Sequence, residues 1–331
     1  MLNDAQTDEI MDRTELGRAL VRKRRYAVAC LAGDGIGPEL MAEASRALAA
    51  VSRLHGFVVE EWHVPFGGDA VRRFGRPFPA ATREAVHAAD AVLVVATKEP
   101  ALEDVKAELD LTWRVQRVIA QGTDLAVFSP LGEEADAWTI ERAFQVARTR
   151  RAHVASVGAG GRWRALFREA ADRHAGVLVE ELALEDALPL LAHAPDRVDV
   201  VVTEGALAEA LSAMAALAEE GSRVVASGRL SGHGPGIFGP THGSAPDIAG
   251  QGVANPSGIL LAAALMLAEG LGERAAATTL EGAVAGTLES GARTPDLVGA
   301  GTGSTTREFM DVLLAKLPGA RTDTEFYAEV K

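Results

Sequence analysis

Cysteine and long apolar runs are scarce in this chain of 331 residues, and basic side chains are outnumbered by acidic ones. The single cysteine, Cys30, excludes an internal disulfide framework. With 33 Lys and Arg against 46 Asp and Glu, the net charge is −13, which argues against a nucleic-acid surface because phosphate binding needs a concentrated excess of cations. The apolar stretch at residues 258–272 contains Glu269 and is shorter than the ~20 residues that cross a bilayer. We therefore expect a soluble, acidic, cytoplasmic protein without nucleic-acid or membrane partners.

Strand-like and helix-like patterns alternate along the chain. Apolar runs at Tyr26–Gly35, Asp90–Thr97 and Asp199–Glu204 are typical of buried strands, whereas Gly37–Gly56 and Trp138–Arg151 have helical spacing. Such alternation predicts an α/β protein with a largely parallel sheet. Residues 1–25 are acidic and unpatterned before the cluster "VRKRR", lack a long apolar segment, and are interpreted as an N-terminal extension that is no secretory signal.

Three motifs occur in a fixed order: "GDGIGPE" at residues 33–39, "DVVVT" at 199–203 and "GPTHGSAPDIAGQGVANP" at 239–256. In this order and spacing the chain resembles the isopropylmalate/isocitrate dehydrogenase family, the NAD(P)-dependent β-decarboxylating dehydrogenases. The resemblance implies a two-lobed α/β fold with a large mixed, mainly parallel sheet flanked by helices. The first, nucleotide-binding lobe would comprise residues 26–100 and 229–331, and the second, substrate and dimerisation lobe residues 101–228.

The resemblance assigns the third motif to the adenosine half of NAD. His242 would lie beside adenine, Asn255 would hydrogen-bond it, and Asp247 would accept hydrogen bonds from both ribose hydroxyls. A carboxylate at Asp247 would repel a 2′-phosphate and so favour NAD over NADP. The small residues of the loop allow the backbone to approach the ligand closely; the loop also contains Gly243, Ser244, Ala245 and Pro246.

The substrate side departs from the family pattern. Two of the family's substrate arginines align with Lys106 and Gln116, and the third aligns with Ser129. After Ser129 the chain is shorter than the family by on the order of twenty residues, which removes the segment with the catalytic tyrosine and the dimer-forming hairpin. Where the family has Asp and the catalytic lysine, this chain has Gly158 and Ala159.

The metal ligands also differ. The two aspartates that follow "DVVVT" in the family align with Glu209 and Ala213, and the aspartate contributed by the partner subunit aligns with Glu185. Mg²⁺ demands near-octahedral geometry at short distances. Two longer carboxylates and one alanine therefore predict no Mg²⁺ or Mn²⁺ site.

We expect the protein to form a homodimer through one helix of the second lobe, because the second lobes of family members pair in this way. Leu207–Ala218 carries an apolar stripe of Leu207, Ala210, Leu211, Met214 and Leu217. The alternative is that this helix packs only into the core of its own chain.

Three functional hypotheses remain open. The leading one is an NAD-binding relative without catalysis, a regulatory or scaffolding subunit that could serve a heteromeric enzyme partner. The second is an NAD-dependent oxidoreductase with a rewired site acting on a hydroxy acid. Its candidate residues are Lys98, Lys106, Arg114, Arg117, Glu185 and Glu209. The third is an ordinary isopropylmalate dehydrogenase whose alignment is displaced.

Overall fold

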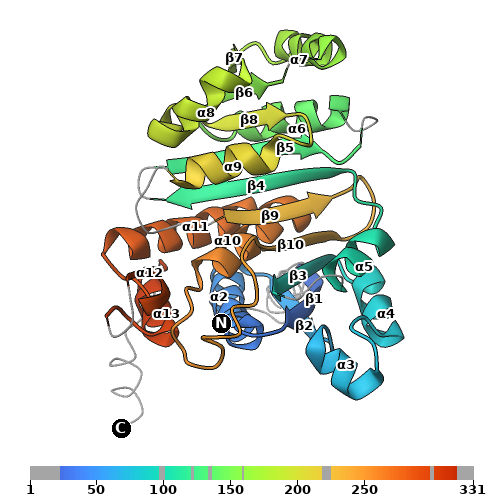
Figure 1. The fold of residues 1–331 in the computed structure, drawn as a ribbon, viewed down its shortest axis with the longest axis vertical. Coiled ribbons are helices and arrows are strands. Elements are labelled where there is room, and N and C mark those ends of the chain that lie inside the picture. The colour runs from blue at the N-terminus through green and yellow to red at the C-terminus, as the bar shows by residue number, and fades with distance from the viewer. Residues whose placement is uncertain are drawn as a thin grey trace, which may run out of the picture.

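The protein is built around one ten-stranded sheet (Figure 1). The structure, a computed structural model, describes residues 23–96, 101–120, 123–132, 136–158, 160–217, 225–298 and 302–318. Most of the predicted N-terminal extension and Lys98 lie outside the described residues. The strand order is β2-β1-β3-β10-β9-β4-β5-β8-β6-β7. Neighbouring strands are parallel except at β10–β9, β9–β4 and β4–β5, so the sheet is mixed and mainly parallel, as predicted.

The strands are β1 Arg25–Gly33, β2 Val58–His63, β3 Ala91–Ala96, β4 Trp113–Ala120, β5 Thr123–Pro130, β6 His153–Val157, β7 Leu178–Leu182, β8 Val200–Thr203, β9 Val225–Leu230 and β10 Gly236–Pro240. The helices are α2 Gly37–His55, α3 Gly68–Phe74, α4 Ala80–Ala88, α5 Ala101–Glu108, α6 Asp136–Ala147, α7 Gly161–Arg173, α8 Leu184–His193, α9 Ala208–Leu217, α10 Ser257–Leu265, α11 Arg274–Glu289, α12 Pro295–Val298 and α13 Thr306–Ala315. A π-helical turn, Met266–Gly270, extends α10.

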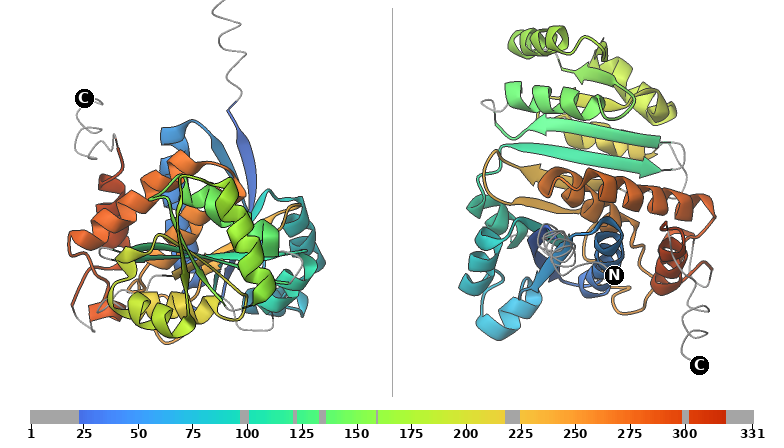
Figure 2. Two further views of the ribbon diagram at one scale, coloured as in Figure 1. Left: turned by 90° about the horizontal axis from the view of Figure 1, so that it is seen from above. Right: turned by 180° about the vertical axis from the view of Figure 1, so that it is seen from behind.

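Helices cover the two faces of the sheet unequally. One face carries α2, α6, α7, α10, α11 and α13 in a continuous apolar core (Figure 2). The other face has two separate apolar clusters, one formed with α4 and α5 and one with α8 and α9. Between α5 and α9 no helix of the described chain covers this second face. Because alternate residues of a strand point to opposite faces, polar residues there remain open to the outside.

The middle strands pack closely against α10 because of three glycines. A Cβ atom added at Gly228, Gly236 or Gly270 would lie 2.8 to 2.9 Å from the ring of Phe238, which is fully buried. The ring of Phe238 thus occupies the space that side chains at the three glycine positions would need. This packing fixes β9 and β10, whose opposite face forms the floor of the uncovered region.

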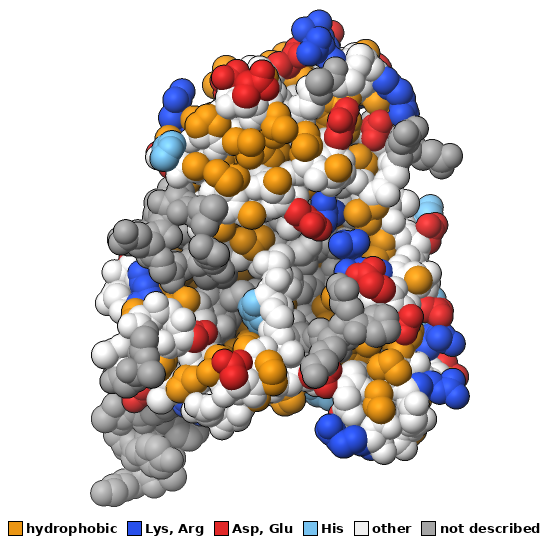
Figure 3. All heavy atoms as spheres, in the orientation of Figure 1, with side chains coloured by type: hydrophobic (Ala, Val, Ile, Leu, Met, Phe, Trp, Pro, Cys, Tyr) orange, Lys and Arg blue, Asp and Glu red, His pale blue; other side chains and the backbone are white. Residues whose placement is uncertain are grey.

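Only part of the apolar stripe that was predicted for the helix at Leu207–Ala218 is buried in the structure. Leu211 is fully buried in the core of its own chain, and Leu207 and Met214 are half-buried against the same cluster. Ala210 is exposed, while the side chain of Leu217 lies outside the described residues. In the space-filling view, hydrophobic side chains gather over α8 and α9 (Figure 3).

Among the described residues, no helix is both long and apolar enough to cross a membrane.

Candidate functional site

A cleft of about 490 Å³ lies over the uncovered part of the sheet, between α5 and α9. Alternating strand residues form its floor, and residues of both flanking helices border it. They include Arg114 and Gln116 of β4, Ser227 and Arg229 of β9, Ile237 and Gly239 of β10, Leu102 and Lys106 of α5 and Glu209 of α9. Cationic and anionic side chains gather at the centre of this face of the molecule (Figure 3). The cleft therefore presents a charged floor to any ligand.

Arg114 is held at the floor of the cleft by three elements. Its Nη1 donates to Glu209 Oε1 at 2.5 Å and its Nη2 to the carbonyl oxygen of Gly205 at 3.0 Å. Its Nε donates to Ser129 Oγ at 3.3 Å. The Arg114 side chain is 6% exposed whereas that of Glu209 is 70% exposed, so the carboxylate remains accessible from the cleft. These bonds fix the orientation of the guanidinium group.

Arg229 is the cation in the cleft that sequence reasoning missed. It is half-buried and has no hydrogen-bond or ion-pair partner among the described residues. Burial lowers the pKa of Arg229, and the neighbouring positive charge of Arg114 lowers it further. The charges of Glu103 and Glu209 offset these effects only in part, and an anion in direct contact with Arg229 would offset them further. The polar alternation of Ser227 and Arg229 in "VASGRL" was the available signal, but it does not reveal which face is uncovered.

The other predicted residues of the substrate side occupy different surroundings. Lys106 Nζ lies 2.6 Å from Glu103 Oε1 at the edge of the cleft. Gln116, aligned with a family arginine, accepts a hydrogen bond from Ser212 of α9 at 3.1 Å. Glu185 is exposed on α8 and does not line the cleft. The structure thus brings Lys106, Arg114 and Glu209 together and leaves Glu185 apart within this chain.

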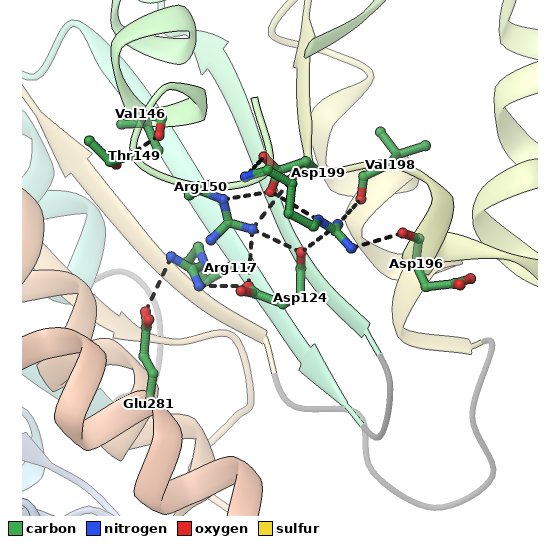
Figure 4. Close-up of polar contacts among 10 residues, drawn as sticks. Arg117, Asp124, Val146, Thr149, Arg150, Asp196, Val198, Asp199 and Glu281 are labelled. Atoms are coloured by element: carbon green, nitrogen blue, oxygen red, sulfur yellow. Dashed lines mark hydrogen bonds and ion pairs between the residues drawn. The ribbon is translucent and has the colours of Figure 1, made fainter. Parts of the chain in front are cut away.

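Arg117 lies on the opposite face of the sheet from Arg114. Its Nη2 lies 2.6 Å from Asp124 Oδ1 and its Nη1 3.2 Å from Glu281 Oε1 on α11 (Figure 4). Arg150 extends this network by contacting both Asp124 and Asp199. Arg117 follows Arg114 by three positions, and an odd offset along a strand places the two side chains on opposite faces of the sheet. Arg117 is therefore part of a buried ion-pair network and not of the cleft.

The predicted nucleotide loop borders a second cavity of about 450 Å³, and Thr241, His242 and Gly243 line both this cavity and the cleft. His242, Gly243, Ala245 and Asn255 line this cavity, together with Ile248 and Gly258. A Cβ at Gly258 would lie 3.2 Å from the His242 ring, so the missing side chain gives the imidazole its place. Ser244, Pro246 and Asp247 belong to the same loop but do not line the cavity. The cavity and its polar groups fit a nucleoside.

Asp296 is the carboxylate that lines this cavity, and sequence reasoning missed it. It lines the cavity directly, and its Oδ2 accepts a hydrogen bond from the backbone N–H of Asn255 at 2.9 Å. Asp247 is exposed, and its carbonyl oxygen accepts a hydrogen bond from Gln251. Both carboxylates are exposed, but only Asp296 is placed at the cavity wall.

The motif "GDGIGPE" contacts the nucleotide loop directly. The N–H of Ile36 donates to the carbonyl oxygen of Ser244 at 2.9 Å. Gly35 has a φ of +60°, and a Cβ atom there would lie only 1.8 Å from the same oxygen. The glycine therefore allows two loops more than 200 residues apart in sequence to pack backbone against backbone.

A third cavity of about 800 Å³ opens beyond Arg114 and Glu209, which border both it and the cleft. Gly160 and Trp163, at the start of α7, line it with Glu204 and Asp136. Trp163 is buried and donates from Nε1 to Ser156 Oγ at 2.9 Å. The alignment predicts the position of the family's catalytic lysine just before this helix, at Ala159. Ala159 lies outside the described residues, and Gly158 carries no ionisable group.

Comparison with known proteins identifies the family. The family model described as isocitrate/isopropylmalate dehydrogenase matches residues 27–128 and 124–313. The chain belongs to this family. It is 33% identical to the 3-isopropylmalate dehydrogenase of Synechococcus sp. (strain CC9605), over 84% of this chain and 95% of that protein. It is 32% identical to the chloroplastic 3-isopropylmalate dehydrogenase of Brassica napus, over 85% and 84%.

Solved structures share the same fold. A β-decarboxylating dehydrogenase from Thermococcus kodakarensis has a TM-score of 0.75 at 26% identity and covers 92% of this chain and 99% of its own. Isocitrate dehydrogenase from Methylococcus capsulatus has a TM-score of 0.74 at 24% identity, over 88% and 99%. The predicted α/β fold of the family is therefore confirmed. The residue boundaries of its two lobes stay a prediction.

Proposed function

We propose that this family member is an NAD-dependent oxidoreductase that acts on a hydroxy acid with a rewired substrate site. The observation that carries the proposal is the partly buried guanidinium of Arg229, which has no hydrogen-bond or ion-pair partner among the described residues. It lies in a cleft that shares Thr241, His242 and Gly243 with the nucleotide cavity. Glu103 and Glu209 act on Arg229 only through their charges, and a substrate carboxylate supplies the direct contact. The names of the relatives, all dehydrogenases, favour catalysis over binding alone.

Each residue of the cleft has a role in this proposal. Arg229 and Arg114 bind the carboxylate, and Lys106 adds positive charge at the edge of the cleft. Glu209 accepts the hydroxyl proton, because its exposed carboxylate borders the cleft. NAD, when bound, supplies the hydride acceptor, so that a hydroxy acid yields a keto acid, NADH and a proton. The third cavity leaves space for a substituent on the substrate.

The proposed chemistry does not depend on Mg²⁺ or Mn²⁺. Glu209 is already paired with Arg114, and Ala213 offers no ligand atom. The fixed guanidinium of Arg114 places a positive charge beside Glu209, where the family uses a divalent ion. We therefore expect neither ion to be required for turnover.

The substitution Arg229→Gln should lower kcat/KM for a 2-hydroxy acid roughly 10- to 100-fold, since a charge-assisted hydrogen bond contributes ~1.5–3 kcal/mol. A panel of 2-hydroxy acids is assayed by NADH absorbance, with and without Mn²⁺. The matched control, Arg72→Gln on exposed α3, should retain full activity. Equal activity of Arg229→Gln and the wild type would contradict the proposed role of Arg229.

A second candidate function is NAD binding without catalysis, and the sequence just before α7 favours it. Gly158 and Ala159 align with the family's aspartate and catalytic lysine, and neither carries a proton-transferring group. This hypothesis predicts a measurable NAD dissociation constant and no NADH formation from any acid of the panel. Calorimetry and the absorbance assay on one preparation distinguish the two functions.

The chain should bind NAD⁺ more tightly than NADP⁺, and Asp247→Ala should reduce that preference, because removal of the carboxylate removes its repulsion of a 2′-phosphate. Calorimetry with both cofactors measures the ratio of dissociation constants. Asp296→Asn is the comparison variant, since Asp296 lines the cavity. If the preference follows Asp296 and not Asp247, the assignment of Asp247 is wrong.

We further propose a homodimer through the hydrophobic surface over α8 and α9, the face that the family uses. Met214→Glu should convert the dimer to monomer, because a charge would be buried in an apolar interface. Sedimentation over a concentration range measures the change. Val71→Glu, which places the same charge at an exposed apolar position of α3, should leave the dimer intact. A wild-type monomer at every concentration would exclude this interface.

A further inference from the structure

Three different metal-ligating side chains converge at the far edge of the first lobe. Cys30 lies on β1, and Glu61 and His63 lie on β2, the edge strand of the sheet. Their Sγ, carboxylate oxygen and imidazole nitrogen atoms all lie within 4.8 Å of one another. Glu61 Oε2 is 3.9 Å from Cys30 Sγ and 3.2 Å from His63 Nε2. No other such group occurs among the residues that the structure describes.

Strand register brings these residues together. Cys30 and His63 are direct partners in the parallel pair β1–β2. Glu61 precedes His63 by two residues and so shares its face of the strand. Cys30 packs in the core beneath α2, and Glu61 extends toward the same helix, where it accepts a hydrogen bond from Ser45 Oγ. The carboxylate is therefore oriented by a residue outside the group, as in many metal sites.

The types of ligand atom and the exposure of the site indicate which kind of metal ion fits it. A thiolate, a carboxylate and a neutral imidazole together carry two negative charges, which a divalent cation balances. Sulfur and nitrogen ligands favour zinc-like ions over Mg²⁺ or Ca²⁺, which prefer oxygen. The His63 side chain is 56% exposed, so an ion can enter from its side and keep a water molecule as a fourth ligand. The Cys30 side chain is 1% exposed, and burial together with the charge of Glu61 raises the pKa of its thiol, so the cation must displace the thiol proton on binding.

We propose that Cys30, Glu61 and His63 form a binding site for a thiophilic divalent cation of the zinc type. With Zn–S near 2.3 Å and Zn–N or Zn–O near 2.0–2.1 Å, tetrahedral ligand atoms lie roughly 3.3–3.6 Å apart. The observed separations exceed this by about an ångström at most, a difference that rotation of the exposed His63 side chain can close. The site is four strands from β9 in the sheet and thus separate from the cleft. Its bound ion would link β1 and β2 beside α2.

Cobalt(II) provides the test, because a thiolate ligand gives it a charge-transfer band in the near ultraviolet. The full chain, freed of metal by a chelator, is titrated with Co²⁺ and then with Zn²⁺. We expect one Co²⁺ per chain, the charge-transfer band, displacement by Zn²⁺, and a higher melting temperature with Zn²⁺. Cys30→Ser should abolish the band, and His63→Gln should weaken Co²⁺ binding at least tenfold.

His87→Gln, an exposed histidine on α4, is the control and should bind Co²⁺ as the wild type does. Circular dichroism of the metal-free variants establishes that they fold. If the buried Cys30→Ser variant does not fold, the exposed His63→Gln variant carries the test. Absence of the charge-transfer band in the wild type, or Co²⁺ binding that His63→Gln leaves unchanged, would overturn the proposal.

Discussion

Replacing Arg117 by leucine should lower the free energy of unfolding by about 3–5 kcal/mol at neutral pH, the usual cost of removing one partner of a buried ion pair. The Arg117 side chain is 9% exposed, and its removal leaves Glu281, which is 19% exposed, without an ion-pair partner among the described residues (Figure 4). Asp124 is 52% exposed and keeps Arg150 at 3.2 Å, so most of the loss arises at Glu281, between α11 and β4. Urea unfolding of the variant and the wild type measures the difference.

The loss should be smaller at pH 4.5 than at pH 7. Burial acts to raise the pKa of Asp124, but the charges of Arg117 and Arg150 outweigh it and hold that pKa below its ordinary value. The stability contributed by Asp124 is therefore present above the ordinary range near pH 4 and is lost as pH falls through the lowered pKa. Burial raises the pKa of Glu281, which Arg117 offsets only in part. Without Arg117 the buried carboxyl of Glu281 favours the protonated form more strongly, whereas Asp124 keeps Arg150, so lowering the pH reduces the cost of the uncompensated Glu281 charge in the variant.

An exposed ion pair serves as the control for this prediction. Arg25 and Glu60 pair across β1 and β2 with side chains 67% and 42% exposed. Arg25→Leu should cost less than about 1 kcal/mol. A destabilisation by Arg117→Leu that is no larger than this, or that does not change with pH, would show that the network contributes nothing special to the fold.

Gly35→Ala should weaken NAD binding at least tenfold and destabilise the protein by about 2–4 kcal/mol. The positive φ of Gly35 accounts for ~1 kcal/mol of this loss. The remaining ~1–3 kcal/mol arises because the new Cβ must displace the backbone at Ser244, and steric overlap of this kind is costly. Displacement of Ser244 moves the loop that contains His242, and the nucleotide cavity changes shape. Calorimetry and denaturant unfolding measure the two effects.

Gly75→Ala separates backbone strain from the contact between loops. Gly75 has a φ of +73°, but no atom lies within 4 Å of the position of its Cβ. This control should therefore lose only the ~1 kcal/mol of backbone strain and keep its affinity for NAD. If Gly35→Ala binds NAD as tightly as Gly75→Ala does, the contact between the two loops has no part in cofactor binding.

Local patterns determined the elements and the family. The strand predicted at Tyr26–Gly35 is β1, the helix predicted at Gly37–Gly56 is α2, and the helix predicted at Trp138–Arg151 overlaps α6. Apolar periodicity and glycine turns act over short distances, so these elements could be found without tertiary information. The nucleotide loop was recognisable for the same reason, since its residues are contiguous. NAD binding, loss of the metal site and dimerisation stay predictions.

The tertiary structure alone decided which polar residues meet. Arg114 and Arg117 were equivalent candidates in sequence, yet they point to opposite faces of β4, and only the face between α5 and α9 is uncovered. Arg229 joins Arg114 because β9 pairs with β4, with Arg114 and Arg229 in register. Cys30 meets His63 through the register of β1 and β2. A sequence determines the period of each strand, but strand pairing and helix coverage are long-range properties, and they select which side chains share a site.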